Sequence, residues 1–221
     1  MKYALLLAAA ACTAVTSQAA IWEFDLGPAV GGFGLNGQNE VPLPTTPSPA
    51  TGREAPLGGA GIEYNDGTKE LTLHYGWGST PDVGGTPLTA NFSAMHIHGP
   101  ANTSGSAGVI YDLVQEDFDD GSQFGLTDEA GDPAAPPSPL RSGHFDFFLT
   151  LRDLPGVKTV AEQETELLGS MWYINIHSGD YPGGEIRGQL IAVPEPEHYA
   201  AFAGLALLGF SGYRRFKLAR A

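Results

Sequence analysis

Cysteine is almost absent from this sequence of 221 residues. The single cysteine, Cys12, lies in an apolar stretch near the N-terminus, so the rest of the chain cannot form an internal disulfide. Small exported domains often depend on disulfides. The roughly 170 residues between the two ends are nevertheless long enough to bury one hydrophobic core without covalent links. We therefore expect a fold that is stabilised by its core alone.

Basic residues are also scarce, and they are unevenly placed. Residues 20–193 contain six Lys plus Arg against 23 Asp plus Glu, a net charge of −17. A surface that binds nucleic acid or anionic lipid needs clustered positive charge. The sequence therefore excludes nucleic acid as a partner of this body, and its acidity favours a well-solvated surface.

Sequence signatures of common enzymes are missing. The chain has no Gly-x-Ser-x-Gly motif, no His-Glu-x-x-His motif and no phosphate-binding glycine loop. A pair of catalytic carboxylates cannot be placed from sequence, because their separation depends on the fold. We expect a protein that is not an enzyme.

The N-terminus has the layout of a secretory signal peptide. Met1-Lys2 is followed by an apolar stretch from Ala4 to Val15 and by the small residues Ser17 and Ala19. We predict a signal peptide over residues 1–19. A lipoprotein signal at Cys12 is the weaker alternative, because it would leave a very short apolar core.

The C-terminus combines three features in a fixed order. Pro194-Glu195-Pro196 precedes an apolar stretch, residues 199–213, and basic residues that include Arg214 and Arg215 follow. This order resembles the PEP-CTERM sorting signal, which implies recognition and removal by an exosortase of a Gram-negative bacterium. A helix of that stretch spans about 22 Å, less than the bilayer core of about 30 Å. A permanent transmembrane anchor is the alternative, and in both cases the basic flank predicts an exported body.

The body, residues 20–193, consists of short apolar runs separated by Gly, Pro, Asn and Asp. This pattern predicts an all-β, antiparallel sandwich or barrel. Residues 160–168 are compatible with a short helix, and the proline-rich residues 42–56 and 128–142 are predicted loops. The expected strands are residues 61–64, 70–77, 91–98, 108–113, 144–151, 171–177 and 185–192.

Four motifs occur in an order that resembles the CHRD domain, across residues 33–192. They are the stretch around Leu35 to Pro42, Met95-His96-Ile97-His98-Gly99-Pro100, the run from Trp172 to Ser178, and Pro182 to Leu190. The resemblance implies an immunoglobulin-like or superoxide-dismutase-like β-sandwich and no established catalytic activity. The chain departs from the pattern at Met95 and in an acidic insertion, residues 116–141. The family-motif positions are Glu40, Asn175, Gly184, Glu185 and Arg187.

Three histidines of these motifs suggest a metal site. Side chains two residues apart in a strand share a face, so His96 and His98 point the same way, as do Asn175 and His177. Three imidazoles on a rigid sheet suit copper or zinc, and Asp180 or His144 could supply a further ligand. The alternative is that the histidines hydrogen-bond across strands without a metal.

Glu185 and Arg187 also share a face, where an ion pair or a hydrogen-bond network would fix the last strand.

The acidic run at residues 116–121 lacks the spacing of an EF-hand calcium loop, and we interpret it as a solvated loop.

Two functions remain open from the sequence. The first is an exported structural or interaction protein of the cell surface or extracellular matrix, with the exosortase machinery, and exopolysaccharide or other surface proteins, as partners. The second is an envelope protein that binds copper or zinc through His96, His98 and His177.

Overall fold

The computed structural model describes residues 19–54, 61–81, 83–114, 123–127 and 140–193, together with the isolated residues 207, 209 and 210. The predicted signal peptide lies outside the described residues except for Ala19. The predicted sorting tail lies outside them except for the three isolated residues. Among the residues that are described, no helix is both long enough and apolar enough to cross a bilayer.

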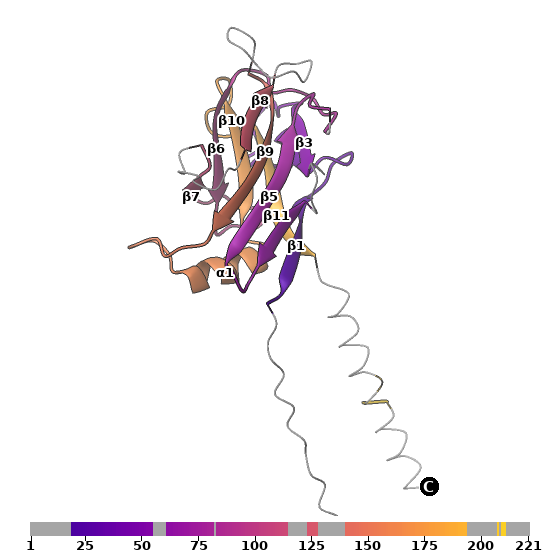
Figure 1. Ribbon diagram of the computed structural model, residues 1–221. Coiled ribbons are helices and arrows are strands. Elements are labelled where there is room, and N and C mark those ends of the chain that lie inside the picture. The colour runs from indigo at the N-terminus through magenta and orange to yellow at the C-terminus, as the bar shows by residue number, and fades with distance from the viewer. Residues whose placement is uncertain are drawn as a thin grey trace, which may run out of the picture.

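The described chain is built almost entirely of antiparallel strands, which confirms the predicted all-β class (Figure 1). Besides the strands, the described residues up to 193 form one short 3₁₀ helix, η1 (Gly37–Asn39), and one α-helix, α1 (Val160–Leu168). The strands are β1 (Ile21–Gly27), β2 (Leu35–Asn36), β3 (Thr51–Glu54), β4 (Ile62–Asn65), β5 (Glu70–Trp77), β6 (Phe92–His98), β7 (Val109–Asp112), β8 (Gln123–Thr127), β9 (Ser142–Thr150), β10 (Tyr173–Ser178) and β11 (Ile186–Val193).

The strands are hydrogen-bonded in the order β1-β4-β5-β3-β2-β11-β10-β6-β7, while β9 pairs with the other side of β5 and β8 with β9. β1 also pairs with β11, so its first residues extend one half of the sheet and its last residues extend the other. The two halves face each other, with β5 and β9 in front of β10 and β11 in Figure 1. Across the interior, the Tyr75 hydroxyl of β5 lies 2.9 Å from the Met95 sulfur of β6.

The core fills the space between the two halves. Alternate residues of β5, β9, β6 and β10 point inward, as the period of two in a strand requires. Among the fully buried side chains are Leu71, Leu73, Tyr75, Met95, Ile97, Phe145, Phe147, Ile174 and Ile176. No disulfide is needed, because these apolar side chains form one continuous cluster.

The predicted strands are all present, with boundaries that shift by one or two residues. The prediction that residues 42–56 form a loop is wrong in part, because Thr51–Glu54 is β3. Proline density hid this strand, which follows Pro49 and pairs with β2 and β5. Gly52 is required there, since a Cβ would collide with the backbone of Gly76 and with Trp77.

The predicted helix at residues 160–168 is confirmed as α1. Thr159 and Glu162 form a capping box at its start, which satisfies amide groups that have no partner inside the helix. α1 covers one end of the sheet (Figure 1), and its buried Gln163 and Leu167 face the core. Trp172 donates an indole hydrogen bond to Glu166 at 3.1 Å.

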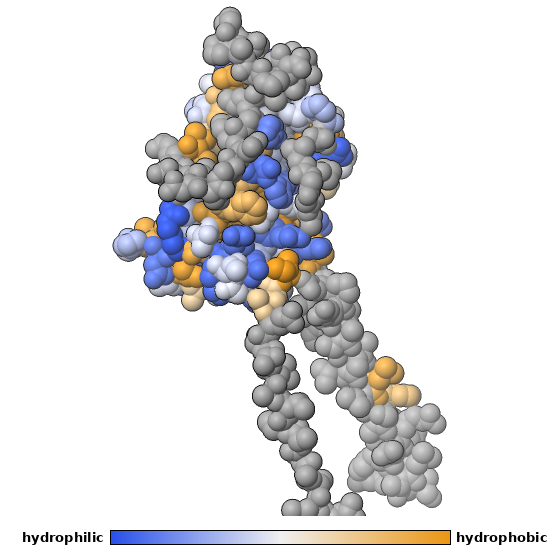
Figure 2. Space-filling view, viewed as in Figure 1, coloured by the Kyte–Doolittle hydropathy of each residue, from blue (hydrophilic) through white to orange (hydrophobic). Residues whose placement is uncertain are grey.

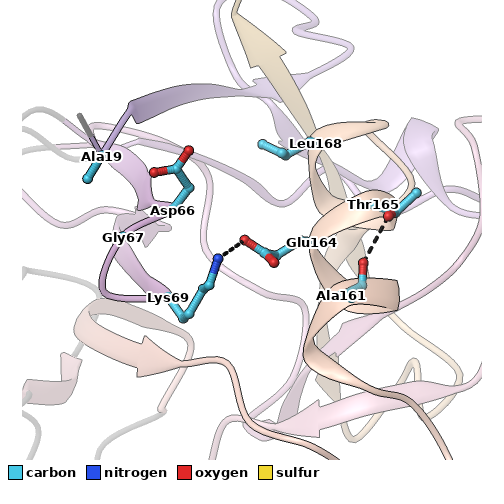
Figure 3. Close-up of a pocket in the computed structure, with 8 residues that line it drawn as sticks. All are labelled: Ala19, Asp66, Gly67, Lys69, Ala161, Glu164, Thr165 and Leu168. Carbon is cyan, nitrogen blue, oxygen red and sulfur yellow. Dashed lines mark hydrogen bonds and ion pairs between the residues drawn. The ribbon is translucent and has the colours of Figure 1, made fainter. Parts of the chain in front are cut away.

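A hollow of about 650 Å³ lies between α1 and the turn that joins β4 to β5. Figure 3 shows Lys69 and Glu164 pointing toward each other across it, with an ion pair of 2.6 Å. Ala19, the residue before the predicted cleavage point, lies at its rim. On the face of the body shown in Figure 2, hydrophilic side chains are interspersed with small apolar groups.

Candidate metal centre

The outer face of β6, β10 and β11 is polar and yet largely buried. Residues that alternate with the core residues of these strands point to it, and most are less than a tenth exposed. Two loops, residues 37–50 and 99–108, supply groups that bond to this face. The polar residues are His96, His98, Tyr173, Asn175, His177, Glu185, Arg187 and Gln189.

Three histidines converge at one edge of this face. One ring nitrogen from each of His96, His98 and His177 lies within 4.8 Å of the others. His96 Nδ1 lies 3.0 Å from His177 Nε2. Two nitrogens bound at about 2.05 Å to one tetrahedral zinc lie about 3.3 Å apart, so the spacing of the His96 and His177 nitrogens is close to that of two ligands of one ion.

Backbone carbonyls fix the tautomers of two of the three rings. His98 Nδ1 lies 3.0 Å from the carbonyl oxygen of Ala107, and His177 Nδ1 lies 3.0 Å from that of Pro182. A carbonyl only accepts, so each Nδ1 carries a hydrogen and each Nε2 presents a lone pair. Metal-bound histidines are held in this way by their second nitrogen.

The His96 ring lies between a carboxylate and the His177 ring. Its Nε2 lies 3.9 Å from Asp112 Oδ2, while its Nδ1 faces His177. Without metal, His96 Nδ1–H donates to the lone pair of His177 Nε2. With metal, the hydrogen would reside on Nε2, next to the negative charge of Asp112.

Burial holds the rings of His98 and His177 in the neutral form, which is the form that binds metal. Burial lowers the pKa of His98 to about 4, although its bond to Ala107 opposes the shift. Burial also lowers the pKa of His177. Both imidazoles are therefore uncharged at neutral pH, with their Nε2 lone pairs available.

A buried atom without a partner supports the fit. His98 is 9% exposed, and its Nε2 has no hydrogen-bond partner among the described residues. Buried polar atoms are rarely left unsatisfied. A borderline-soft metal ion would satisfy this lone pair, and so the donor set fits copper or zinc.

The two further ligand candidates do not join the cluster. His144 lies on β9, where it pairs with Gly76 of β5 in the other half of the sheet. Asp180 lies in the connection between β10 and β11, and its side chain is not among the converging groups. Within the described part of the chain, only His96, His98 and His177 form such a group.

The family-motif residues form a network beside the histidines. Arg187 is 2% exposed and donates to the carbonyls of Gly105 and Asn102, at 2.7 and 3.0 Å, and to Gln189 Oε1 at 3.1 Å. Glu185 is fully buried and accepts from Ser48 Oγ and from the Thr89 amide, each at 2.7 Å. Of the two arrangements predicted for this strand, the structure has the hydrogen-bond network.

Tyr173 connects this network to the metal candidates, although it was not among the predicted site residues. The Arg187 guanidinium lies 3.5 Å from the centre of the Tyr173 ring, on which the His98 ring stacks at 4.9 Å and an interplanar angle of 7°. Its position on the same face as His177 was the available signal. Asp112, Ser48 and Thr89 were also missed, because they lie outside the recognised motifs.

Comparison with known proteins places the chain at the level of a family. The family model of the CHRD domain matches residues 32–190, which is most of the chain. No curated protein and no solved structure matches.

Proposed function

The chain belongs to the CHRD-domain family, and we propose that it is an exported envelope protein that binds a single copper or zinc ion through His96, His98 and His177. One observation carries the metal assignment: three imidazoles from two neighbouring strands converge within 4.8 Å. The carbonyls of Ala107 and Pro182 turn the Nε2 atoms of two of them toward one point.

The chemistry of the donors limits what the site can hold. Three imidazole nitrogen donors favour copper or zinc over magnesium or calcium, which prefer oxygen. Three protein ligands leave a fourth position, which a bound ion would fill with water or with a group of a partner. The other described groups supply no second nitrogen cluster, so the proposal is limited to one ion per chain.

Metal content is the direct test. The full chain, expressed with its own leader and purified in detergent, should contain close to one copper or zinc per chain by mass spectrometry. His177→Ala should abolish this content, because it removes the lone pair that faces His96. The matched control is His144→Ala, which changes a histidine on β9 outside the cluster. It should retain the metal.

The competing interpretation predicts a different result. If the histidines only hydrogen-bond to one another, the wild-type chain would stay metal-free after incubation with copper or zinc and removal of the excess. That result would refute the metal assignment and leave the structural or interaction role as the remaining proposal.

A contact at the start of the described chain supports export. The Ala20 amide nitrogen donates to Asp66 Oδ1 at 2.7 Å. Cleavage after Ala19 would convert this nitrogen into the terminal ammonium, and a backbone hydrogen bond would become an ion pair with the same carboxylate. The intact mass of the exported protein should therefore correspond to a chain that begins at Ala20. A chain that keeps residues 1–19 would contradict this cleavage site.

The rest of the proposal concerns display. The resemblance of residues 194–221 to a PEP-CTERM signal supports sorting by an exosortase to the cell surface or extracellular matrix, where exopolysaccharide or other surface proteins are the proposed partners. The two facing halves of the antiparallel sheet support an immunoglobulin-like or superoxide-dismutase-like sandwich. Deletion of residues 194–196 in an exosortase-containing host should retain the protein in the membrane fraction. Release identical to wild type would refute sorting through this motif.

A further inference from the structure

Three buried side-chain oxygens of the family-motif residues have no hydrogen-bond partner within the part of the chain that the structure describes. They are Glu40 Oε1, Asn175 Oδ1 and Glu185 Oε2. Their residues are 6%, 4% and 0% exposed. A buried acceptor without a donor is costly and needs an explanation.

The fold brings these residues to one place. Glu40 ends η1, and its Oε2 accepts from Asn175 Nδ2 at 3.4 Å. A Cβ at Gly184 would overlap the carboxamide of Asn175, so the backbone that leads into Glu185 lies against that amide. Glu185 also acts electrostatically on the Glu40 carboxyl, so both glutamates lie near the Asn175 amide.

The loop over residues 37–48 closes this place from the other side. Ser48 at one end of the loop donates to Glu185 Oε1 at 2.7 Å. Gly37 at the other end packs directly against the Ser48 backbone, so closely that a Cβ would collide with it. The loop therefore places Glu40 against Asn175 and Ser48 against Glu185.

The nearby positive charge does not satisfy these oxygens. Arg187 lies close enough to Glu40 to lower its pKa, but the bonds of its guanidinium go to Gly105, Asn102 and Gln189. The pKa of Glu40 is raised to about 7, mainly by burial, and the nearby Glu185 acts in the same direction. Two buried carboxylates near one occupied arginine are an environment that attracts a further cation.

We propose that Glu40, Asn175 and Glu185 form a second cation site, which takes a hard divalent ion of the calcium class. Carboxylate and amide oxygens are the ligands such ions prefer, and water or backbone carbonyls would complete the shell. The donors differ from those of the histidine site, and the proposal does not depend on copper or zinc binding. An exported protein meets calcium at concentrations that suit sites with Kd of roughly 10⁻⁴ to 10⁻³ M.

Calcium titration of the full chain tests the proposal. The detergent-purified protein is stripped with chelator and titrated with calcium chloride by calorimetry at pH 7.5, and its Tm is followed in parallel. We expect one calcium per chain and a rise in Tm at millimolar calcium. His177→Ala should bind calcium as wild type does, which separates this site from the histidine site.

Substitutions locate the ion. Glu40→Gln and Glu185→Gln keep the shape of the side chain but remove a charge, and each should weaken calcium binding by at least tenfold. Both should retain copper or zinc. The matched control is Glu54→Gln, at a partly buried glutamate on β3 outside the cluster, which should leave calcium binding unchanged.

Two results would overturn the proposal. One is the absence of calcium heat and of any Tm shift in wild-type protein up to about 10 mM calcium, ten times the upper limit above. The other is a Tm that depends on pH between 5 and 8 identically with and without calcium. In that case a proton shared by the buried oxygens would occupy the place assigned to the cation.

Discussion

The two faces of the β6–β10–β11 sheet are both buried but have opposite chemistry. The inner face carries Met95, Ile97, Ile174, Ile176 and Ile186, each 0% exposed. The outer face places histidine, asparagine, arginine and glutamate side chains between them at every second position. Ile176 and Arg187, for example, are almost equally inaccessible to water.

The difference shows how each face is stabilised. The inner face needs only close packing, because removing apolar surface from water is favourable by itself. The outer face gains nothing unless each polar atom finds a partner. Loop carbonyls at Gly105, Ala107 and Pro182 supply many of these partners. The atoms left over, such as His98 Nε2, mark the two proposed ion sites.

The largest losses of stability are expected when one buried residue of either face is replaced by alanine. Ile176→Ala leaves a cavity and should lower the free energy of unfolding by about 2–5 kcal/mol. Arg187→Ala leaves two carbonyls and Gln189 without their donor, and should cost about 3–5 kcal/mol. Urea denaturation measures both losses.

Metal affinity separates these two variants. Arg187→Ala should also weaken copper or zinc binding, since Arg187 stacks on Tyr173, which stacks on His98. Ile176→Ala should not. Equal metal affinity in the two variants would contradict the role assigned to the outer network. So would an Arg187→Ala variant whose free energy of unfolding falls by less than about 1 kcal/mol.

The pH dependence of the metal-free protein should reveal two opposing groups on the outer face. The pKa of His98 is lowered from 6.5 to about 4, chiefly by burial. Its contribution to stability is therefore complete above pH 6.5 and lost as the pH falls to 4. The pKa of Glu40 is raised from 4.5 to about 7, again chiefly by burial. Its contribution is complete below pH 4.5 and lost as the pH rises to 7.

Each shift corresponds to about 3 kcal/mol, so the two effects largely cancel in the wild-type chain. Glu40→Gln, which keeps His98, should lose stability when the pH falls from 7 to 4.5. His98→Gln, which keeps Glu40, should lose stability when the pH rises from 4.5 to 7. Urea titrations in chelator at several pH values measure both slopes. The double variant is the control: its remaining slope should come from other groups such as His177, whose pKa burial also lowers. Single variants with the slope of wild type would disprove these assignments.

The smallest effect is expected from removing one hydroxyl of the outer face. Tyr173 Oη accepts from the Ala107 amide at 3.1 Å and donates to the Ala107 carbonyl at 3.2 Å. Tyr173→Phe keeps the ring that stacks on His98 and should cost about 0.5–1.5 kcal/mol. Metal affinity should fall less than tenfold, because His98 Nδ1 still bonds to Ala107.

Tyr181→Phe is the matched control, since the Tyr181 hydroxyl donates to Thr46 at the surface. Thermal unfolding of the two variants compares the hydroxyls directly. If Tyr181→Phe lowers the Tm more than Tyr173→Phe does, then Tyr173 does not anchor the loop over residues 99–108.

The sequence predicted those parts of the fold that depend on periodicity. The strand that ends at His98 and the strand that ends at Ser178 were placed correctly, because apolar residues alternate along them. The same alternation predicted that His96 and His98 share a face. β1, β2, β3 and β8 were not predicted: β2 has two residues, β3 lies in a proline-rich stretch, and β1 alternates apolar with acidic residues next to the expected cleavage site.

The sequence by itself therefore determined the class of fold and the face on which the histidines lie, since side-chain direction in a strand follows from position alone. Only the tertiary structure decided that His177 meets His96, that Ala107 and Pro182 orient the rings, and that Glu40 reaches Asn175. These contacts join residues from separate strands and from loops without a repeating pattern. Their geometry depends on the pairing of strands and on the packing of loops over the sheet.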